Sequence, residues 1–555
     1  MSKIRAKNTV VYKKNKTFHY LCPTNNPPYK HMLFNSIEFA LFLPVVFLLY
    51  WLLTPRNSNA VGSTPRYSIF KYIGKNIGID TQLRLQNLFV VVASYVFYGW
   101  WDWRFLLLIA FTSLCSWASG ILIDKHKYVL GGGTEYQAVT QQTSIKHNLN
   151  WSKFYLTLNI VINLLILGFF KYYNFFVESF VDAFALCGVR LHASTLQIIL
   201  PVGISFYTFQ ALSYSIDIYR RKLDVCRDPI AFFAYVSFFP QLVAGPIERA
   251  TNLLPQMQKP RTFNYEKAVD GCRQMLWGLF KKIVIADNCA VYVNEVFANY
   301  QNQSGSTLLL AAILFTFQIY GDFSGYSDIA IGCAKLFGID LMQNFRYPYF
   351  SRDIAEFWRR WHISLTTWFR DYIYIPLGGS RTTKAKVIRN TFIIFLVSGF
   401  WHGANWTFIA WGAYHAFLFL PLILLGKNRR YTDTVAEGRI LPSLKETFQM
   451  LTTFMLAVIG WIIFRAESIT QAWEYMCGMC DASLFSVPWL KIREFYIPLF
   501  TSIILMLVIE WNNRDKQKSL YLHKNTYIRW LIFEILIGAM LVYGGSSSEF
   551  IYFQF

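Results

Sequence analysis

Long, mostly apolar runs recur along this 555-residue chain, and they constrain its fold more than any other feature. Several approach the ~20 residues that a bilayer-spanning helix needs. They predict an all-α polytopic membrane protein with about eleven to thirteen transmembrane or re-entrant helices, in which 391–425 holds either one long helix or two short ones. The runs lie near 33–54, 86–101, 105–123, 154–170, 196–216, 229–247, 271–290, 307–320, 391–425, 447–464, 495–510 and 530–545.

The charge of the chain is strongly basic, with 53 Lys and Arg against 32 Asp and Glu, a net charge of +21. In a multi-pass membrane protein, excess basic residues belong to cytoplasmic loops near anionic lipid. Nucleic-acid binding is the weaker interpretation, since no soluble basic domain is present. Cys477 and Cys480 form a single CxxC without further ligands at matching spacing, so no metal site is expected.

The sequence divides into two unequal parts. Residues 1–31 are polar and lysine-bearing, and we interpret them as a disordered extension or as a start codon assigned too early. Residues 32–555 then form a single membrane domain. Within it, 346–390 is basic and rich in tryptophan.

Aromatic residues in 346–390 recur at steps of three and four, which predicts one amphipathic helix. Such a helix lies at the membrane interface or re-enters the bilayer with its aromatic side buried. His362 falls at the border of this stripe. The stripe consists of Trp358, Trp361, Leu365, Trp368 and Tyr372, and Arg359, Arg360 and Arg370 lie off it.

One titratable residue, His402, stands inside the apolar stretch FLVSGFWHGANWTFIAWG at 395–412. A polar group in hydrocarbon costs several kcal/mol unless it is paired or used, so His402 is a functional candidate. The alternative is a structural histidine bonded to a backbone carbonyl. In a continuous helix Asn405 would lie one turn on and could orient the imidazole, whereas His415 would face elsewhere and is interpreted as structural.

A second polar cluster lies in QIYGDFSGYSDIAIGCAKLFG at 318–338. Gly321 and Gly325, four residues apart, predict close helix packing. The favoured interpretation is structural support, with the carboxylates anchoring arginines of the basic segment; the alternative is the polar lining of a cavity. The polar candidates are Asp322, Ser324, Tyr326 and Asp328.

Several motifs together resemble the membrane-bound O-acyltransferase family, and within it the branch that O-acetylates alginate. They are LPVGISFYTFQALSYSIDIYR (200–220), FFPQLVAGPIER (238–249), YGDFSGYSDIAIG (320–332), FWRRWHISLTTWFRDYIYIPLGG (357–379) and SGFWHGANWTFIAWG (398–412). The resemblance implies a ring of helices around a central funnel. It also implies that His402 is the catalytic histidine and that His362 matches a second recurring histidine, which orients, assists or binds a headgroup.

The resemblance further implies acetyl transfer from a cytoplasmic thioester, acetyl-CoA or an acyl-carrier thioester, across a bacterial inner membrane to an exported, alginate-like polysaccharide. No tightly bound cofactor is expected. The implied partners are a periplasmic esterase-like acetyltransferase, the polysaccharide, membrane lipids and an acyl carrier protein. Arg359, Arg360 and Arg370 are candidates for binding the donor's phosphates, because guanidinium binds phosphate bidentately, or for binding lipid.

The C-terminal residues FIYFQF are unusually aromatic for a chain terminus. They resemble a motif of related acylation systems, which implies that the Tyr552 hydroxyl carries the acyl group as a covalent relay. The alternative is an aromatic anchor at the membrane surface.

Two other functions fit the same sequence. The acyl group could be D-alanyl or another group delivered to a different envelope polymer, or the protein could be a lipid or glycan transporter that performs no acyl chemistry.

Overall fold

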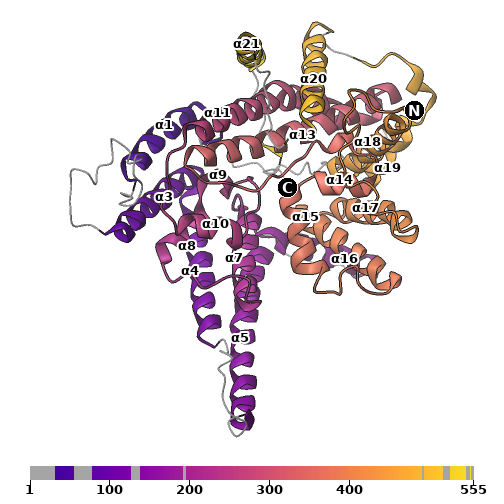
Figure 1. Cartoon of the computed structure of the whole chain (residues 1–555). Helices are drawn as coiled ribbons and strands as arrows, with labels where there is room; N and C mark the ends of the chain where they lie inside the picture. The colour runs from indigo at the N-terminus through magenta and orange to yellow at the C-terminus, as the bar shows by residue number, and fades with distance from the viewer. Residues whose placement is uncertain are drawn as a thin grey trace, which may run out of the picture.

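The computed structural model describes residues 32–54, 78–126, 138–189, 191, 195–489, 493–516, 525–544 and 550–551, and every regular element in them is helical (Figure 1). The predicted all-α class is therefore confirmed. The interpretation of residues 1–31 lies outside the described residues.

The helices follow one another through the whole described chain. The α-helices are α1 (Ile37–Leu52), α3 (Ile79–Asp102), α4 (Arg104–Lys125), α5 (Ala138–Leu167), α6 (Tyr173–Leu186), α7 (Ile204–Tyr219), α8 (Pro229–Ser237), α9 (Phe239–Leu242), α10 (Ala250–Met257), α11 (Tyr265–Phe280), α12 (Asp287–Ala298), α13 (Gly305–Leu336), α14 (Ile354–Arg360), α15 (Ile363–Phe369), α16 (Lys384–His402), α17 (Trp406–Leu424), α18 (Leu444–Arg465), α19 (Ile469–Met479), α20 (Arg493–Asn513) and α21 (Thr526–Tyr543). Three π-helical turns join some of them: η2 (Gly168–Tyr172), η3 (Lys281–Ala286) and η6 (Arg370–Tyr374).

Seven helical stretches of the described chain are long and apolar enough to cross a membrane, which makes this a multi-pass membrane protein. The expected number of eleven to thirteen transmembrane or re-entrant helices stays a prediction, because it also includes shorter or more polar helices. The seven are Arg104–Lys125, Asn150–Leu186, Gly305–Leu336, Trp406–Leu424, Leu444–Arg465, Tyr496–Asn513 and Thr526–Tyr543.

Helix α13 connects the two hydrophobic cores of the molecule and crosses its upper centre in Figure 1. Its residues up to Tyr320 pack with α12, α17, α18 and α20. From Phe323 onward they pack with α1, α3, α7 and α8. The residues between these two positions, including Asp322, therefore lie at the junction of the cores.

Glycines allow α11 and α13 to pack backbone against backbone. A Cβ on Gly278 would lie 2.5 Å from the Gly325 carbonyl oxygen, and one on Gly321 would lie 3.0 Å from the Lys281 oxygen. Small residues at a four-residue step permit this approach. The predicted packing role of Gly321 and Gly325 is confirmed.

The prediction of one continuous helix through the tryptophan-rich segment is wrong. Helix α14 ends at Arg360 and α15 begins at Ile363, because His362 adopts a left-handed backbone with φ 43°. The segment beside the break supplies the missing partners: the Ile363 N–H donates to the Asn344 carbonyl at 2.8 Å. The tryptophans of the stripe, Trp358, Trp361 and Trp368, are nevertheless buried.

Candidate active site

His402 is the last residue of α16, and its side chain is buried. The helix stops there because Gly403 is fully extended, so 391–425 holds two helices. Aromatic rings from three helices surround the imidazole. Ring centroids of Trp401, Trp411 and Phe464 lie 4.8, 5.2 and 5.3 Å from that of His402.

Asn405 does not hold the imidazole, so that prediction is wrong. It is the N-cap of α17, where its side-chain oxygen accepts from the Thr407 N–H at 3.0 Å. Its amide nitrogen donates to the Glu467 carbonyl at 3.0 Å. The break after His402 removes the helical geometry on which the expected contact depended.

Lys171 contacts the end of α16 directly. Its ammonium group, carried by η2, donates to the carbonyl oxygens of Trp401 at 2.7 Å and His402 at 3.0 Å. A cation is favourable at the C-terminus of a helix, where the last carbonyls lack intrahelical donors. The sequence analysis missed this residue, although Lys171 is the single charged residue between 154 and 177 and such residues are functional candidates.

His362 is buried beside the indole of Trp401, the residue that also contacts His402. Its ring centroid lies 6.0 Å from Trp401 and 4.6 Å from Phe323. His362 Nδ1 lies 2.9 Å from the side-chain oxygen of Asn344. As an amide oxygen only accepts, Nδ1 carries the proton, which leaves Nε2 as the basic nitrogen.

Asn344 is itself held in place. Its oxygen accepts from the Ser364 hydroxyl at 2.9 Å, and its nitrogen donates to the Ser327 hydroxyl at 3.0 Å. These contacts fix a histidine whose left-handed backbone costs about 1–2 kcal/mol. The structure thus brings both His402 and His362 to the indole of Trp401 and supports His362 from α13.

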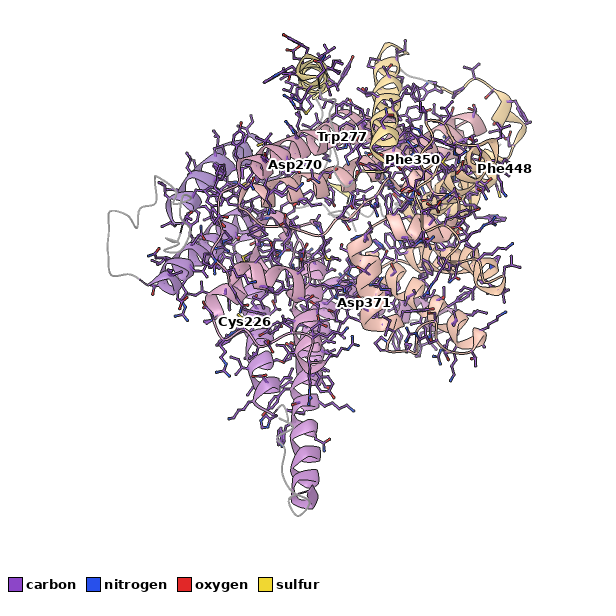
Figure 2. The ribbon with its side chains drawn as sticks, in the orientation of Figure 1. Cys226, Asp270, Trp277, Phe350, Asp371 and Phe448 are labelled. Atoms are coloured by element: carbon purple, nitrogen blue, oxygen red, sulfur yellow. The ribbon has the colours of Figure 1, made fainter. Side chains whose placement is uncertain are left out.

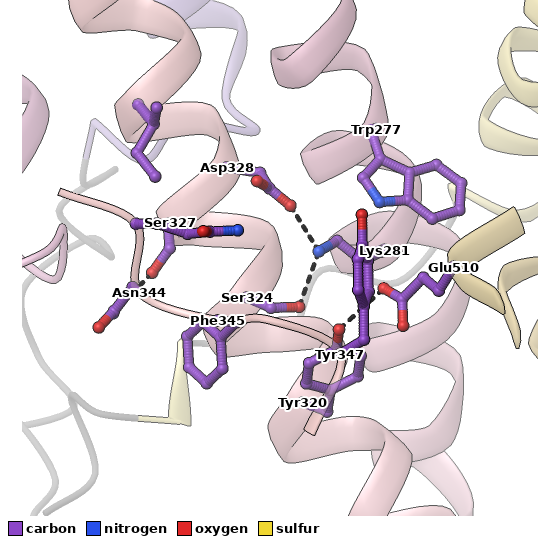
Figure 3. Close-up of a pocket in the computed structure, with 12 residues that line it drawn as sticks. Trp277, Lys281, Tyr320, Ser324, Ser327, Asp328, Asn344, Phe345, Tyr347 and Glu510 are labelled. Atoms are coloured by element: carbon purple, nitrogen blue, oxygen red, sulfur yellow. Dashed lines mark hydrogen bonds and ion pairs between the residues drawn. The ribbon is translucent and has the colours of Figure 1, made fainter. Parts of the chain in front are cut away.

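A small polar pocket borders Asn344 (Figure 3). Ser324 and Asp328 line it, and both contact Lys281: the ammonium group lies 2.6 Å from Asp328 Oδ2 and 2.8 Å from Ser324 Oγ. The other two predicted lining residues, Asp322 and Tyr326, border a separate small pocket.

The predicted partners of the two carboxylates were wrong. Asp328 and Asp322 pair with Lys281 and Lys282 of η3, and not with arginines of the basic segment. The π-helical turn places consecutive lysines against α13, which the sequence pattern did not reveal.

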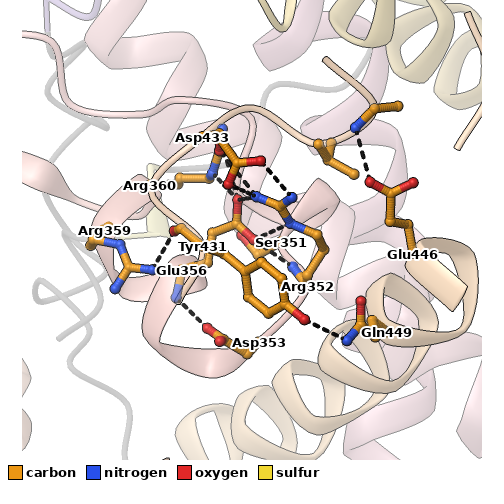
Figure 4. Close-up of polar contacts among 12 residues, drawn as sticks. Ser351, Arg352, Asp353, Glu356, Arg359, Arg360, Tyr431, Asp433, Glu446 and Gln449 are labelled. Atoms are coloured by element: carbon orange, nitrogen blue, oxygen red, sulfur yellow. Dashed lines mark hydrogen bonds and ion pairs between the residues drawn. The ribbon is translucent and has the colours of Figure 1, made fainter. Parts of the chain in front are cut away.

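The three predicted donor-binding arginines all contact protein groups. Arg360 is buried against Glu356 at 2.8 Å, and exposed Arg359 donates to the Tyr431 carbonyl at 2.6 Å (Figure 4). Exposed Arg370 pairs with Asp371 at 2.7 Å; Figure 2 shows Asp371 near α15 and α16. Phosphate binding by these arginines therefore stays a prediction.

Arg352 was missed, and it organises this cluster. It pairs with buried Glu356 at 3.0 Å and with Asp433 at 3.0 Å. Within the described residues no group of three or more His, Cys, Asp or Glu side chains is arranged to hold a metal ion.

The model of the membrane-bound O-acyltransferase family matches residues 97–464, which include both histidines. The chain belongs to this family. It is 41% identical to the "Probable alginate O-acetylase AlgI" of Pseudomonas aeruginosa over 70% of this chain and 69% of that protein. It is 36% identical to the protein of the same name from Pseudomonas putida (85% and 95%), and 30% identical to the "Peptidoglycan O-acetyltransferase" of Helicobacter pylori (94% and 98%).

As a membrane-bound O-acyltransferase, this chain is an acyltransferase, and both of these histidines are buried. Lys171 also lies within the matched region. Phe550 and Ile551 lie beyond it but are buried in the same structure. Tyr552 lies outside the described residues.

Proposed function

We propose that this protein transfers acetyl groups from a cytoplasmic thioester, acetyl-CoA or an acyl-carrier thioester, across the bacterial inner membrane to hydroxyls of an exported, alginate-like polysaccharide. One observation carries the proposal: a buried histidine, His402, stands beside a second buried histidine in a chain of an O-acyltransferase family. The names of the relatives, an alginate O-acetylase and a peptidoglycan O-acetyltransferase, support acetyl as the group and a polysaccharide as the acceptor.

His402 is proposed as the general base. Its imidazole takes the proton of an acceptor hydroxyl as that oxygen attacks the thioester carbonyl. The new C–O bond replaces the C–S bond, and the thiolate leaves with the proton that the imidazole returns. A positioned base of this kind contributes about 10²–10⁴ in rate.

The charge distribution supports a cytoplasmic donor. Helix α14 and the segment 427–431 lie against each other and carry Arg359, Arg360 and several further basic residues. Basic loops of membrane proteins favour the cytoplasmic side. Arg359 and Arg370, which are exposed, are then the accessible candidates for a phosphate of coenzyme A or of an acyl carrier protein.

The same orientation supports the proposed partners. Acetyl groups that leave the membrane on the far side need a periplasmic, esterase-like acetyltransferase to reach a long polymer. Membrane lipids surround the exposed apolar faces of helices such as α21, where only Leu536 is buried.

The experiment is labelled-acetate feeding of cells that carry His402→Ala. We expect the label to disappear from the exported glycan while protein level and polymer export stay at wild-type values. Label at the wild-type extent would contradict the proposal. Loss of export together with the label would favour a transporter, and labelled D-alanine on an envelope polymer would favour aminoacyl transfer.

A finer proposal concerns Tyr552. Its hydroxyl would accept the acetyl group from the thioester as an ester and pass it to the glycan, with His402 taking and returning the proton at each step. Burial of the preceding Phe550 and Ile551 supports it. Intact mass of the C-terminal peptide under turnover should show an acetyl adduct. Absence of an adduct in an active preparation, with full activity of Tyr552→Phe, would leave the aromatic-anchor alternative.

A further inference from the structure

The two-residue segment Phe550–Ile551 lies in the protein core beside α13. Phe550 and Ile551 are each only 2% exposed. The Phe550 ring centroid lies 4.9 Å from that of Tyr326 and 6.2 Å from that of Phe323. The two residues are therefore packed as core residues, whereas in the preceding helix, α21, Leu536 is the one buried residue.

A main-chain hydrogen bond holds this segment. The Ile551 N–H donates to Asp322 Oδ2 at 2.6 Å. The other oxygen, Oδ1, lies 2.6 Å from the Lys282 ammonium, which also lies 2.8 Å from Asp287. All three side chains of this cluster are at least nine-tenths buried.

The cluster buries one ammonium group between two carboxylates, those of Asp322 and Asp287. Buried carboxylates are costly unless they are paired and hydrogen-bonded. The Ile551 amide supplies a further donor to the carboxylate, and hydrogen bonds to an ionised acceptor are stronger than neutral ones. The segment thus completes the hydrogen bonding of Asp322.

Asp322 lies close to the midpoint of α13, a helix long enough to cross the bilayer, and at the junction of the two cores. The neighbouring Phe323 packs edge-on against His362 at 4.6 Å between ring centroids. One turn of α13 therefore contacts both Ile551 and the second histidine of the site.

We propose that Asp322, held by Lys282, is a positioning residue that anchors the segment Phe550–Ile551 beside Phe323 and His362, so that these two residues are a built-in part of the acyl-transfer site. The proposal rests on the proposed function for its consequence in catalysis. The anchor itself rests on the Ile551–Asp322 contact and on the burial of Phe550.

The first test measures release of residues after Ile551 by carboxypeptidase from the purified full chain in nanodiscs, followed by mass spectrometry. Ile551→Pro removes the N–H and leaves the Asp322–Lys282 pair intact, whereas Ile551→Val keeps the N–H. We expect at least tenfold faster release from Ile551→Pro and from Asp322→Ala than from wild type or Ile551→Val. Asp322→Asn, which keeps an acceptor oxygen, should fall between them.

A matched control lies on the same pair of helical elements. The Lys281–Asp328 pair has the same 2.6 Å separation as Lys282–Asp322, but the hydrogen bonds described for Asp328 are with Lys281 and Gln274. Asp328→Ala should therefore leave release of the C-terminal residues at the wild-type rate. Equal rates for wild type, Ile551→Pro and Asp322→Ala would overturn the proposal, as would equal acceleration by Asp328→Ala.

The second test separates the anchor from the proposed function. Deletion of 550–555 and Asp322→Ala should each reduce acetyl transfer, and the double variant should be no worse than the deletion. Additive losses of acetyl transfer in the double variant would contradict the proposal that Asp322 acts by anchoring Phe550 and Ile551. His402→Ala should abolish transfer with wild-type carboxypeptidase protection, so retained transfer in that variant would refute the function without touching the anchor.

Discussion

The ammonium group of Lys171 donates to the main-chain carbonyl of His402 at 3.0 Å, although 231 residues separate them in sequence. The next residue, Tyr172, donates from its hydroxyl to the Phe400 carbonyl at 2.9 Å. A π-helical turn within the apolar stretch Asn150–Leu186 thus supplies donors to the last turn of α16. This contact holds the end of α16 in place, and with it the candidate base.

Lys171→Met should reduce acetyl transfer by about 10- to 100-fold, because two charge-assisted hydrogen bonds that hold the end of α16 are lost. Lys171→Arg should recover part of the activity. Tyr172→Phe removes one neutral bond and should lower activity less. Transfer is measured in membranes and normalised to protein level; a fully active Lys171→Met protein would contradict this role.

Asn344→Ala should lower activity because it removes the acceptor that fixes the tautomer of His362. We expect a loss of about tenfold or more, with the pH profile of transfer shifted, since the protonation of His362 is no longer fixed. The effects of substitutions at residues that act as a unit do not add. The Asn344→Ala/His362→Ala double variant should therefore match His362→Ala alone, and a multiplicative loss would argue for two separate roles.

Much of the fold was predictable because burial in lipid imposes a simple pattern. The helices and the buried aromatic stripe follow from apolar runs and periodicity. The break at His362 was not predictable, because it depends on Asn344 and Ser364, which meet it only in the folded chain. The three- and four-residue spacing of the aromatic residues continues across this turn, so the spacing gives no sign that the helix is interrupted.

Two residues near the site could have been interpreted correctly from the sequence. Asn405 was assigned the wrong role, and Lys171 was overlooked. Asn405 directly precedes an apolar helix, as an N-cap residue does, and Gly403 lies two positions before it. Lys171 is a lone charge in an apolar run. In contrast, the contact between Asp322 and Ile551 joins residues 229 positions apart, so no local sequence pattern predicts it.

Glu356→Ala should destabilise the protein by about 3–5 kcal/mol, because it leaves the buried guanidinium groups of Arg352 and Arg360 without their shared carboxylate. Glu356→Gln, which retains an acceptor, should cost less. The measurement is thermal unfolding in detergent. Asp340→Ala breaks an exposed pair with Lys267 and should change stability by about 0–1 kcal/mol. Equal losses of Tm in Glu356→Ala and Asp340→Ala would refute the stabilising role assigned to Glu356.

The contribution of Asp433 to stability should vanish in acid. The hydrogen bond from Arg352 lowers the pKa of the Asp433 carboxyl below its usual 3.8. A carboxyl with a depressed pKa stabilises the fold above its unfolded pKa, and that contribution is lost as the pH falls through the lowered value. Because Asp433 is half exposed, the effect is about 0.2–1 kcal/mol. The Tm difference between wild type and Asp433→Asn should narrow between pH 5 and pH 2.5.

Gly399→Ala should disrupt the candidate site through helix packing. A Cβ at Gly399 would lie 2.2 Å from the Phe408 carbonyl oxygen of α17, a contact with backbone that no side-chain rotation relieves. The two helices must then separate, which displaces His402 from Trp411 and Phe464. We expect a loss of more than tenfold in transfer and a lower Tm. Gly538→Ala in α21, where nothing lies within 4 Å of the added Cβ, should retain activity and slightly raise stability. A Gly399→Ala protein with wild-type Tm and activity would show that α16 and α17 tolerate a wider separation and that the site does not depend on their close packing.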